Sequence, residues 1–200
     1  MPVSICNSAL GKIGEPYIAA LTDDTTAAKV CNEQYPKVRD ELLTLHPWNF
    51  ATTRVALAQT TTTPAFEFDY EYAMPADFLR LLDLEDNTCK YKIEGNAEGS
   101  ALVLRSDESS MKIRYVRRVT NTALMTPIFK EVLAWRLAIE IAPIILQDNS
   151  QMTVLWEAYL KTFSDATTID SQEDYPDPMA PEDGAWLDSR WSGNAGVSSS

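Results

Sequence analysis

The spacing of apolar residues changes twice along these 200 residues, and this change limits the chain to a fold of mixed helices and strands. Near the N-terminus, apolar residues recur at the three- and four-residue spacing of one helix face: Cys6, Ala9, Leu10 and Ile13. This spacing predicts a short first helix. Gly14 and Pro16 follow it and form a stop signal typical of helix C-termini.

A second helix is predicted from about Thr22 and Asp23, whose side chains can cap free amide groups. It should end at His46, because Pro47 disfavours helical geometry in the residue before it. Its buried seam is expected to contain Ala28, Cys31, Tyr35, Val38, Leu42 and Leu45. Pro36 lies inside this helix, so it should remove one backbone hydrogen bond and bend the axis.

Between residues 49 and 120 the pattern favours strands, because short segments rich in β-branched and aromatic residues alternate with turn-forming pieces. The predicted strands are residues 50–58, 66–72, 79–84, 90–94, 101–105 and 111–119. We expect them to form a compact antiparallel sheet or a small barrel.

Helical patterns return after Thr126 and Pro127, a capping residue followed by a proline at the first helical position. Residues 132–146 are apolar on nearly every side, which predicts the buried centre of the helical unit. A last helix should begin at Ser150, with one apolar stripe formed by Met152, Trp156, Tyr159, Phe163 and Ala166.

The predicted fold class is therefore α+β. Residues 1–48 and 121–168 should form a discontinuous helical bundle, residues 49–120 an inserted small antiparallel β domain, and residues 169–200 an extended acidic C-terminal tail.

The expected tail carries much of the negative charge. From Asp165 onward, eight acidic residues against Arg190 alone give −7 of the chain's net −12. Such a segment does not bury enough apolar surface to fold alone. Its large apolar residues, Trp186, Leu187 and Trp191, are therefore expected to dock in a partner's pocket, the alternative being a tail with no binding role. Asp170, Glu173 and Asp174 could hold a hard cation if helical, although a solvated tail is the preferred interpretation.

Net charge also limits the partners. With 17 basic residues against 29 acidic ones, broad coating of nucleic acid is disfavoured, and docking on basic protein surfaces is favoured. Positive charge gathers on one predicted strand, at Lys112, Arg114, Arg117 and Arg118. This group is either a solvated strand face or a contact for phosphate or for a neighbouring subunit's acidic tail. Arg136 and Glu140, four residues apart in an apolar helix, should pair with each other or across a subunit boundary.

Signals of catalysis are scarce. His46 is the only histidine, and at a helix end before a proline it is expected to cap a carbonyl rather than act as a base. Cys6, Cys31 and Cys89 are odd in number and widely separated, which predicts reduced thiols and no zinc site. Neither GxGxxG nor a phosphate-binding GK[ST] loop is present. We expect no cofactor, no metal and no enzymatic activity, with a small hydrolase using His46 as a minor alternative.

No membrane association is expected. The N-terminal MPVSICNSAL lacks the basic start and apolar stretch of a signal peptide. The most apolar stretch, residues 132–146, is shorter than the roughly 20 residues that cross a bilayer.

Six pieces of the sequence resemble head-to-tail adaptor proteins of tailed bacteriophages, a family that includes tail tubular protein A. They are LGKIGEP at 10–16, LTDDTTAAKVCNEQYPKVRDELLTLHPWNFA at 21–51, YEYAMPADFLRLL at 70–82, IRYVRRVTNTALMTPIF at 113–129, LAWRLAIEIA at 133–142 and WEAYLKTFSDATTIDSQE at 156–173. Their order and spacing, rather than any single piece, make the resemblance specific.

The resemblance implies a structural virion protein at the head–tail junction, assembled as a ring, commonly of twelve copies. Such a ring docks under the portal protein, extends the DNA channel and provides the attachment site for tail nozzle proteins. DNA would pass through its lumen without sequence-specific binding, and the C-terminal extension would dock on the portal. The alternative function is an acidic regulator or DNA mimic that binds a basic partner.

In such a ring, the segment HPWNFA at 46–51 would brace the hinge between the helical bundle and the β domain. His46 and Pro47 should end the second helix, and Trp48 and Phe50 should begin the first strand. Burial of these aromatic side chains would make the hinge rigid, so the motif is expected to be structural.

Overall fold

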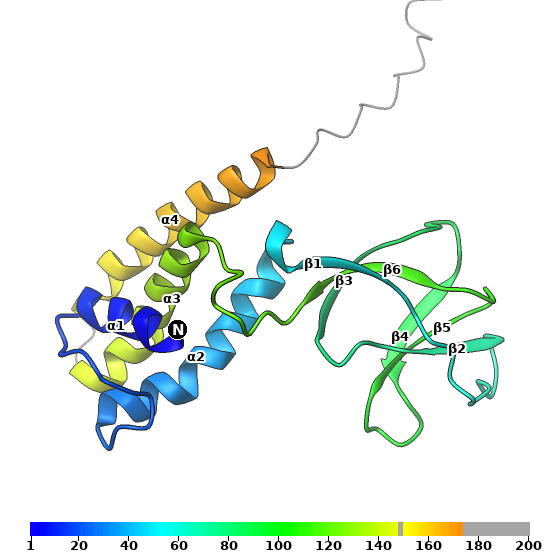
Figure 1. Ribbon diagram of the computed structural model, residues 1–200, viewed down its shortest axis with the longest axis horizontal. Coiled ribbons are helices and arrows are strands. Elements are labelled where there is room, and N and C mark those ends of the chain that lie inside the picture. The colour runs from blue at the N-terminus through cyan, green and yellow to red at the C-terminus, as the bar shows by residue number, and fades with distance from the viewer. Residues whose placement is uncertain (148–149, 174–200) are drawn as a thin grey trace, which may run out of the picture.

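The computed structural model describes residues 1–147 and 150–173. Figure 1 shows helices gathered at one end of an elongated molecule and strands at the other. The helices are α1 (Pro2–Lys12), α2 (Thr26–Leu45), α3 (Pro127–Leu146) and α4 (Met152–Gln172), and a 3-10 turn, η1, spans Asn49–Ala51. The strands are β1 (Thr52–Ala56), β2 (Tyr70–Ala73), β3 (Phe78–Leu84), β4 (Tyr91–Gly95), β5 (Leu102–Ser106) and β6 (Lys112–Arg117). The predicted α+β class is confirmed.

Helix α1 ends as its sequence predicts. Gly14 adopts a left-handed φ of 78°, and its N–H donates to the carbonyl of Gly11, while the N–H of Glu15 donates to that of Leu10 at 3.0 Å. These two bonds form a Schellman motif, which satisfies carbonyl groups that the helix end leaves free. The apolar face of α1 is buried as predicted, with Cys6, Ala9 and Leu10 fully covered.

Helix α2 begins later than predicted. Its N-cap is Thr25, whose hydroxyl accepts from the N–H of Ala28. Asp23 instead closes the preceding loop, where its carboxylate accepts from the N–H groups of Ala19 and Ala20. A short polar side chain can bond to the backbone of a loop as well as cap a helix. The presence of Asp23 alone therefore did not show where α2 begins. The predicted seam is buried except for Leu45, which is 52% exposed.

Helix α3 is the centre of the bundle, as its uniform apolarity predicts. It packs against α1, α2 and α4, and its buried residues include Phe129, Val132 and Leu137. Thr126 caps its N-terminus by accepting from the N–H of Phe129 at 3.3 Å. Of the alternatives for its charged pair, the first holds within this chain: Arg136 bonds to Glu140 and also to Glu41 of α2.

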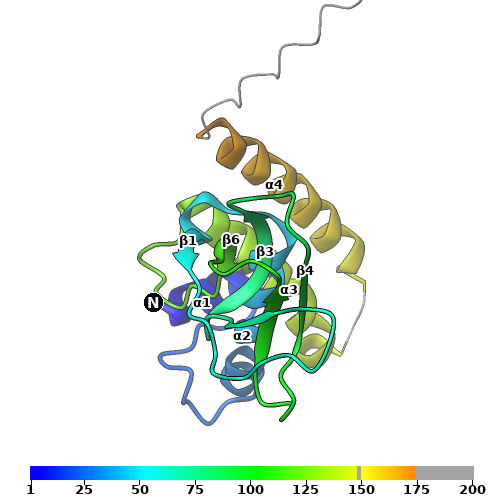
Figure 2. The same cartoon turned by 90° about the vertical axis from the view of Figure 1, so that its right-hand side faces the viewer.

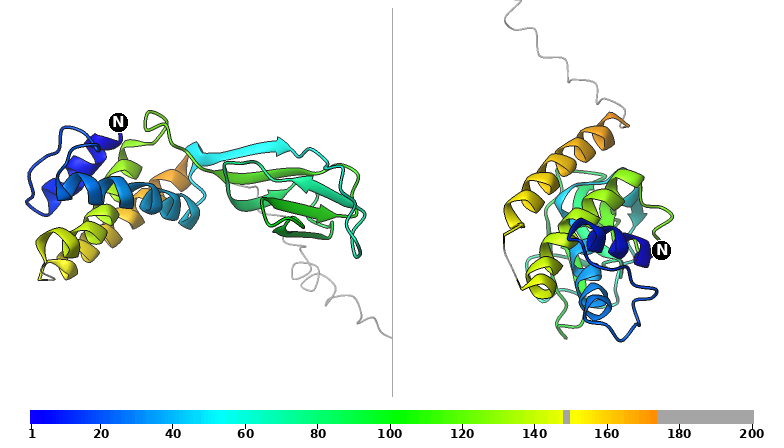
Figure 3. Two further views of the ribbon diagram at one scale, coloured as in Figure 1. Left: turned by 90° about the horizontal axis from the view of Figure 1, so that it is seen from below. Right: turned by 90° about the vertical axis from the view of Figure 1, so that its left-hand side faces the viewer.

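Helix α4 runs beyond its predicted end. It continues to Gln172, so residues 169–172 belong to the helix and not to an extended tail. Its stripe is only partly buried: Tyr159 and Ala166 are covered, whereas Trp156 is 40% exposed. Figure 3 shows α4 lying along the other helices, with its last turns close to the start of the strands.

The strands form two three-stranded antiparallel sheets rather than one. Their orders are β1-β6-β3 and β2-β5-β4. Six side chains form a small core within this part of the molecule: Tyr72, Leu84, Leu104, Met111, Ile113 and Tyr115. The segment after β1 connects the sheets, since the N–H of Leu57 donates to Met111 and the N–H of Ala73 donates to Ala58. The first two predicted strands are shorter than expected, and Phe66 lies in a loop, 80% exposed.

The helical core continues into the first sheet through Trp48, Ala51, Val116 and Val119. Figure 2 shows the strands in front of the helices, viewed along the line that joins the two ends. Arg80 of β3 donates to the carbonyl of Thr44 near the end of α2, and Arg118 contacts Asp40 of α2. The two ends of the molecule therefore share both packing and polar contacts.

The three cysteines are free thiols, in agreement with the predicted reduced state. Cys6 and Cys31 lie in the helical core, where a hydrogen bond with Cys31 and burial raise the pKa of Cys6. Within residues 1–147 and 150–173, no helix combines the length and the hydropathy that crossing a membrane requires.

Candidate functional site at the junction of helices and strands

The segment HPWNFA lies where α2 passes into β1. The backbone of His46 is extended, with φ −131° and ψ 143°, as the following Pro47 favours. Residues Asn49–Ala51 then form η1, so Phe50 lies in a tight turn and β1 begins only at Thr52. The prediction that Trp48 and Phe50 begin the strand was wrong. The turn directs both rings toward α3 instead.

Trp48 fills the centre of this junction. It is fully buried, and its indole N–H donates to the carbonyl of Leu42 at 2.9 Å. Its ring centroid lies 4.7 Å from that of His46 and 5.0 Å from that of Phe129. Phe50 also packs on Phe129, at 4.9 Å. A buried tryptophan with a satisfied N–H and edge-on aromatic neighbours stabilises one arrangement of the surrounding elements.

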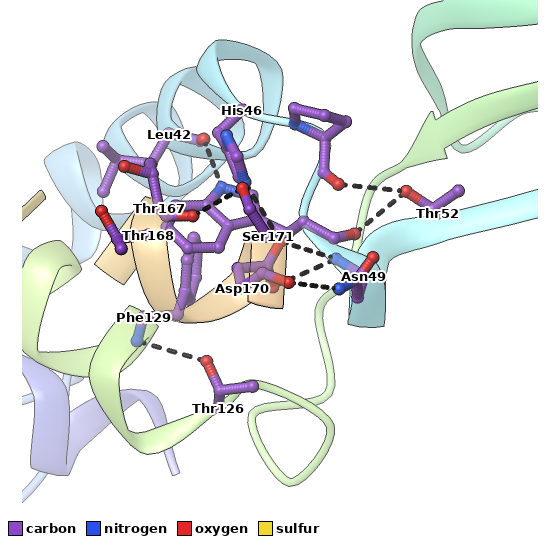
Figure 4. Close-up of polar contacts among 12 residues, drawn as sticks. Leu42, His46, Asn49, Thr52, Thr126, Phe129, Thr167, Thr168, Asp170 and Ser171 are labelled. Atoms are coloured by element: carbon purple, nitrogen blue, oxygen red, sulfur yellow. Dashed lines mark hydrogen bonds and ion pairs between the residues drawn. The ribbon is translucent and has the colours of Figure 1, made fainter. Parts of the chain in front are cut away.

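Asp170, in the last turn of α4, bonds to this junction through His46 and Asn49. Figure 4 shows its carboxylate directed at His46 and Asn49. Asp170 Oδ2 lies 3.1 Å from His46 Nε2, and the carboxylate accepts from the N–H of Asn49 at 3.2 Å. The side-chain amide of Asn49 donates to the carbonyl of Asp170 at 2.7 Å. We call these contacts the Asp170 clasp.

The clasp corrects two expectations. His46 pairs with a carboxylate and does not cap a carbonyl. Asp170 is buried, 5% exposed, and is therefore not part of a solvated tail. Asp174, which could join it in holding a cation, lies outside the described residues. The burial of Asp170 depends on residues more than a hundred positions earlier in the chain, which is why local pattern did not reveal it.

The junction has the contacts of a structural joint. Ser171, the nearest hydroxyl in sequence to Asp170, donates to the carbonyl of Thr167 at 2.8 Å, inside its own helix. Among the residues that the structure describes, no group of three His, Cys, Asp or Glu side chains is placed to hold a metal ion.

The four basic residues expected on one strand do not form a single patch. Lys112 pairs with Glu85 at 2.8 Å, and Arg114 pairs with Asp83 at 3.3 Å, both on the outer face of the first sheet. Arg117 lies at an odd position of β6, on the opposite face, and its Nε has no hydrogen-bond partner in the described part of the chain. Arg118, just past the strand, bonds to Asp40 at 2.7 Å.

A groove of about 600 Å³ crosses the outer face of the sheet β1-β6-β3. Its charged lining residues are Arg54, Asp83, Glu85, Lys112 and Arg114. Lys112 and Arg114 could be singled out from the sequence, whereas Arg54, Asp83 and Glu85 could not, because strand register decides which charged residues become neighbours. The tail residues Trp186, Leu187 and Trp191 lie outside the described residues.

Comparison with known proteins leaves the site to be interpreted from its own contacts. No protein-family model matches the chain, and no curated protein matches it.

Proposed function

We propose that this chain is a structural subunit of a head-to-tail adaptor ring in a tailed bacteriophage particle. The ring docks under the portal protein, extends the DNA channel and provides the attachment site for tail nozzle proteins. Its place is the head–tail junction of the virion. The proposal rests on the resemblance of six sequence pieces, and the structural observation that supports it best is the Asp170 clasp.

The clasp matters because a closed ring needs subunits of constant shape. In a head-to-tail ring, each copy uses two different faces, and the angle between them decides whether the ring closes. Because all copies have the same sequence, a change in the angle between helices and strands is repeated at every contact, about twelve times in the proposed ring. The clasp, together with the bonds Arg80–Thr44 and Arg118–Asp40, holds the strands at one angle to the helices.

Three apolar residues of the C-terminal segment, Trp186, Leu187 and Trp191, are proposed to dock on the portal. Large aromatic side chains are the usual anchors of protein interfaces. Lys112, Arg114, Arg117 and Arg118 are proposed for contacts between subunits or with the DNA. Three of the four already have carboxylate partners in their own chain. These partners offset the positive charge that would otherwise hold phosphate groups, which favours passage of DNA without sequence-specific binding.

The test is assembly with the portal. Purified full-length protein, mixed with portal rings and imaged by electron microscopy, should add a second ring of density below the portal. Asp170→Ala should weaken ring formation, whereas Asp165→Ala, an exposed acid on the same helix, should leave it intact. Protein that stays monomeric and never associates with the portal would refute the proposal.

The alternative function, an acidic regulator or DNA mimic, draws on the net charge of −12. A deletion that separates the two must start after Glu173, because removal of Asp170 would open the clasp. A chain without residues 174–200 would lose all activity as a mimic. As a ring subunit, it would lose portal docking but keep its lateral contacts, which size measurement at high protein concentration would detect.

A further inference from the structure

The groove on the outer face of β1, β6 and β3 is the uncovered part of a sheet face that α2 covers elsewhere. Nearer the helices, the same face carries Val116, which is fully buried in the helical core, and Arg80, which bonds to α2. Further along the strands, none of the helices α1 to α4 lies over it, and the lining becomes charged. The groove is thus an exposed surface whose base is formed by the strands β1, β3 and β6.

This groove has a surplus of positive charge. Arg54 and Arg114 are direct partners across the β1–β6 pair, and Asp83 is the next residue in the same row. Like charges directly opposite each other destabilise an antiparallel pair. Asp83 contacts Arg114, whose side chain is still 42% exposed, whereas the side chain of Arg54 makes no ion pair or hydrogen bond with residues 1–147 and 150–173. With Lys112 and Glu85, three cations face two carboxylates.

A further carboxylate between Arg54 and Arg114 would complete the row. Guanidinium groups bind carboxylates in a planar, two-bonded geometry, and Arg54 has its full set of donors available. We propose that the acidic C-terminal segment, residues 174–200, supplies this carboxylate to the groove of its own chain. That segment contains Asp174, Asp177, Glu182, Asp183 and Asp188 against Arg190 alone, a net charge of −4.

The segment begins close to the groove, so only a short stretch of chain is needed to reach Arg54. Asp170 bonds to Asn49, so the segment leaves α4 beside the start of β1, five positions before Arg54. A chain extends about 3.3 Å per residue, so roughly six residues beyond Glu173 span the distance to Arg54. Glu182, Asp183 and Asp188 lie farther along the chain than that and are within reach.

An acidic peptide suits the groove better than nucleic acid does. Asp83 and Glu85 line the groove beside the cations and would repel the closely spaced charges of a phosphate backbone. Except for the adjacent Glu182 and Asp183, the carboxylates of residues 174–200 are separated by neutral residues, so a single one can enter between the arginines without placing others against Asp83. This inference goes beyond the proposed ring and concerns the isolated chain, which would hold its portal-docking residues against its own sheet before assembly.

The experiment compares backbone amide signals of two full-length proteins by nuclear magnetic resonance at low ionic strength. One has the native segment, and the other has D174N, D177N, E182Q, D183N and D188N together. We expect the signals of residues 54–56 and 112–114 to shift between them, and high salt to abolish the difference. None of the five substitutions changes a residue of either described core, so we expect the fold to be preserved in both proteins.

Charge reversal in the groove supplies the second arm. With Arg54→Glu, neutralisation of the segment should no longer shift the signals of residues 112–114. The matched control, Lys161→Glu, makes the same charge change at an exposed position of α4 and should leave the shifts unaltered. Retention of the full response in Arg54→Glu would overturn the proposal.

Three further outcomes would overturn it. Identical spectra of the native and neutralised segments would show that the groove is empty. Shifts that vanish on dilution would assign the contact to a second copy. A response to short duplex DNA, without any response to neutralisation, would make the groove a phosphate site. Portal binding does not enter any of these measurements, so their failure is distinct from failure of the proposed function.

Discussion

At the scale of single residues, Asp170 is the position on which the junction most depends. Asp170→Ala removes the partner of His46 and leaves the N–H of Asn49 unpaired. Loss of hydrogen bonds to a buried charged group costs about 2–4 kcal/mol. We expect the free energy of unfolding, measured in urea, to fall by that amount. Asp165→Ala makes the same change in helix propensity at an exposed site, and an equal loss there would contradict the role of the clasp.

A second prediction at this scale concerns Tyr35, whose buried hydroxyl has no hydrogen-bond partner among the described residues. An unpaired buried polar group costs about 1–3 kcal/mol. Tyr35→Phe should therefore raise the free energy of unfolding by about 1 kcal/mol at neutral pH. Tyr17→Phe, at a side chain that is 73% exposed, should have no effect. A clear loss of stability in Tyr35→Phe would refute this expectation.

The same variant makes a prediction for alkaline pH. Burial raises the pKa of Tyr35 to about 12 from a reference of 10.0. Between these values the unfolded chain releases the phenolic proton while the folded chain retains it, so stability falls as pH rises through this window. The decline should be shallower in Tyr35→Phe. It should not vanish, because burial and a bond to Asp77 also raise the pKa of Tyr115 to about 12.

At the scale of an element, two glycines, one inside α1 and one just after its end, should respond in opposite directions. A Cβ on Gly14 would meet no atom within 4 Å, but its φ of +78° strains any L side chain, so Gly14→Ala should cost about 1 kcal/mol. Gly11 lies inside the helix, and a Cβ there would meet only the flexible side chain of Tyr17 at 3.3 Å. Gly11→Ala should therefore be neutral or stabilising by up to about 1 kcal/mol. Thermal unfolding of both variants measures the difference, and equal effects would contradict the C-cap assignment.

At the scale of the whole molecule, the helices and strands should unfold together. Val116 and Ala51 belong to the helical core although they lie in or beside the first sheet. In hydrogen exchange, the amides of α3 and β6 should show similar free energies of opening. With Asp170→Ala, the β6 amides should open at lower free energy than those of α3. Independent opening in the native protein would mean that the clasp does not couple the two ends.

Much of this fold follows from local patterns. The spacing of Cys6, Ala9 and Leu10, the stop at Gly14 and the cap at Thr126 each act within a few residues of the chain. Backbone geometry and hydrogen bonding of neighbouring residues decide such features. For this reason the helices, the strand-rich middle and the α+β class could be predicted without knowledge of the packing.

The candidate sites depend on contacts between distant residues. Asp170 is one more acid in an acidic stretch until the packing of α4 on α3 places it beside Asn49. Arg54 and Arg114 become neighbours only through the register of β1 with β6. The sequence by itself determined which segments are helical or extended, because those preferences are local. Only the tertiary structure decided which charges meet and which are buried, because burial and pairing depend on how separate elements pack.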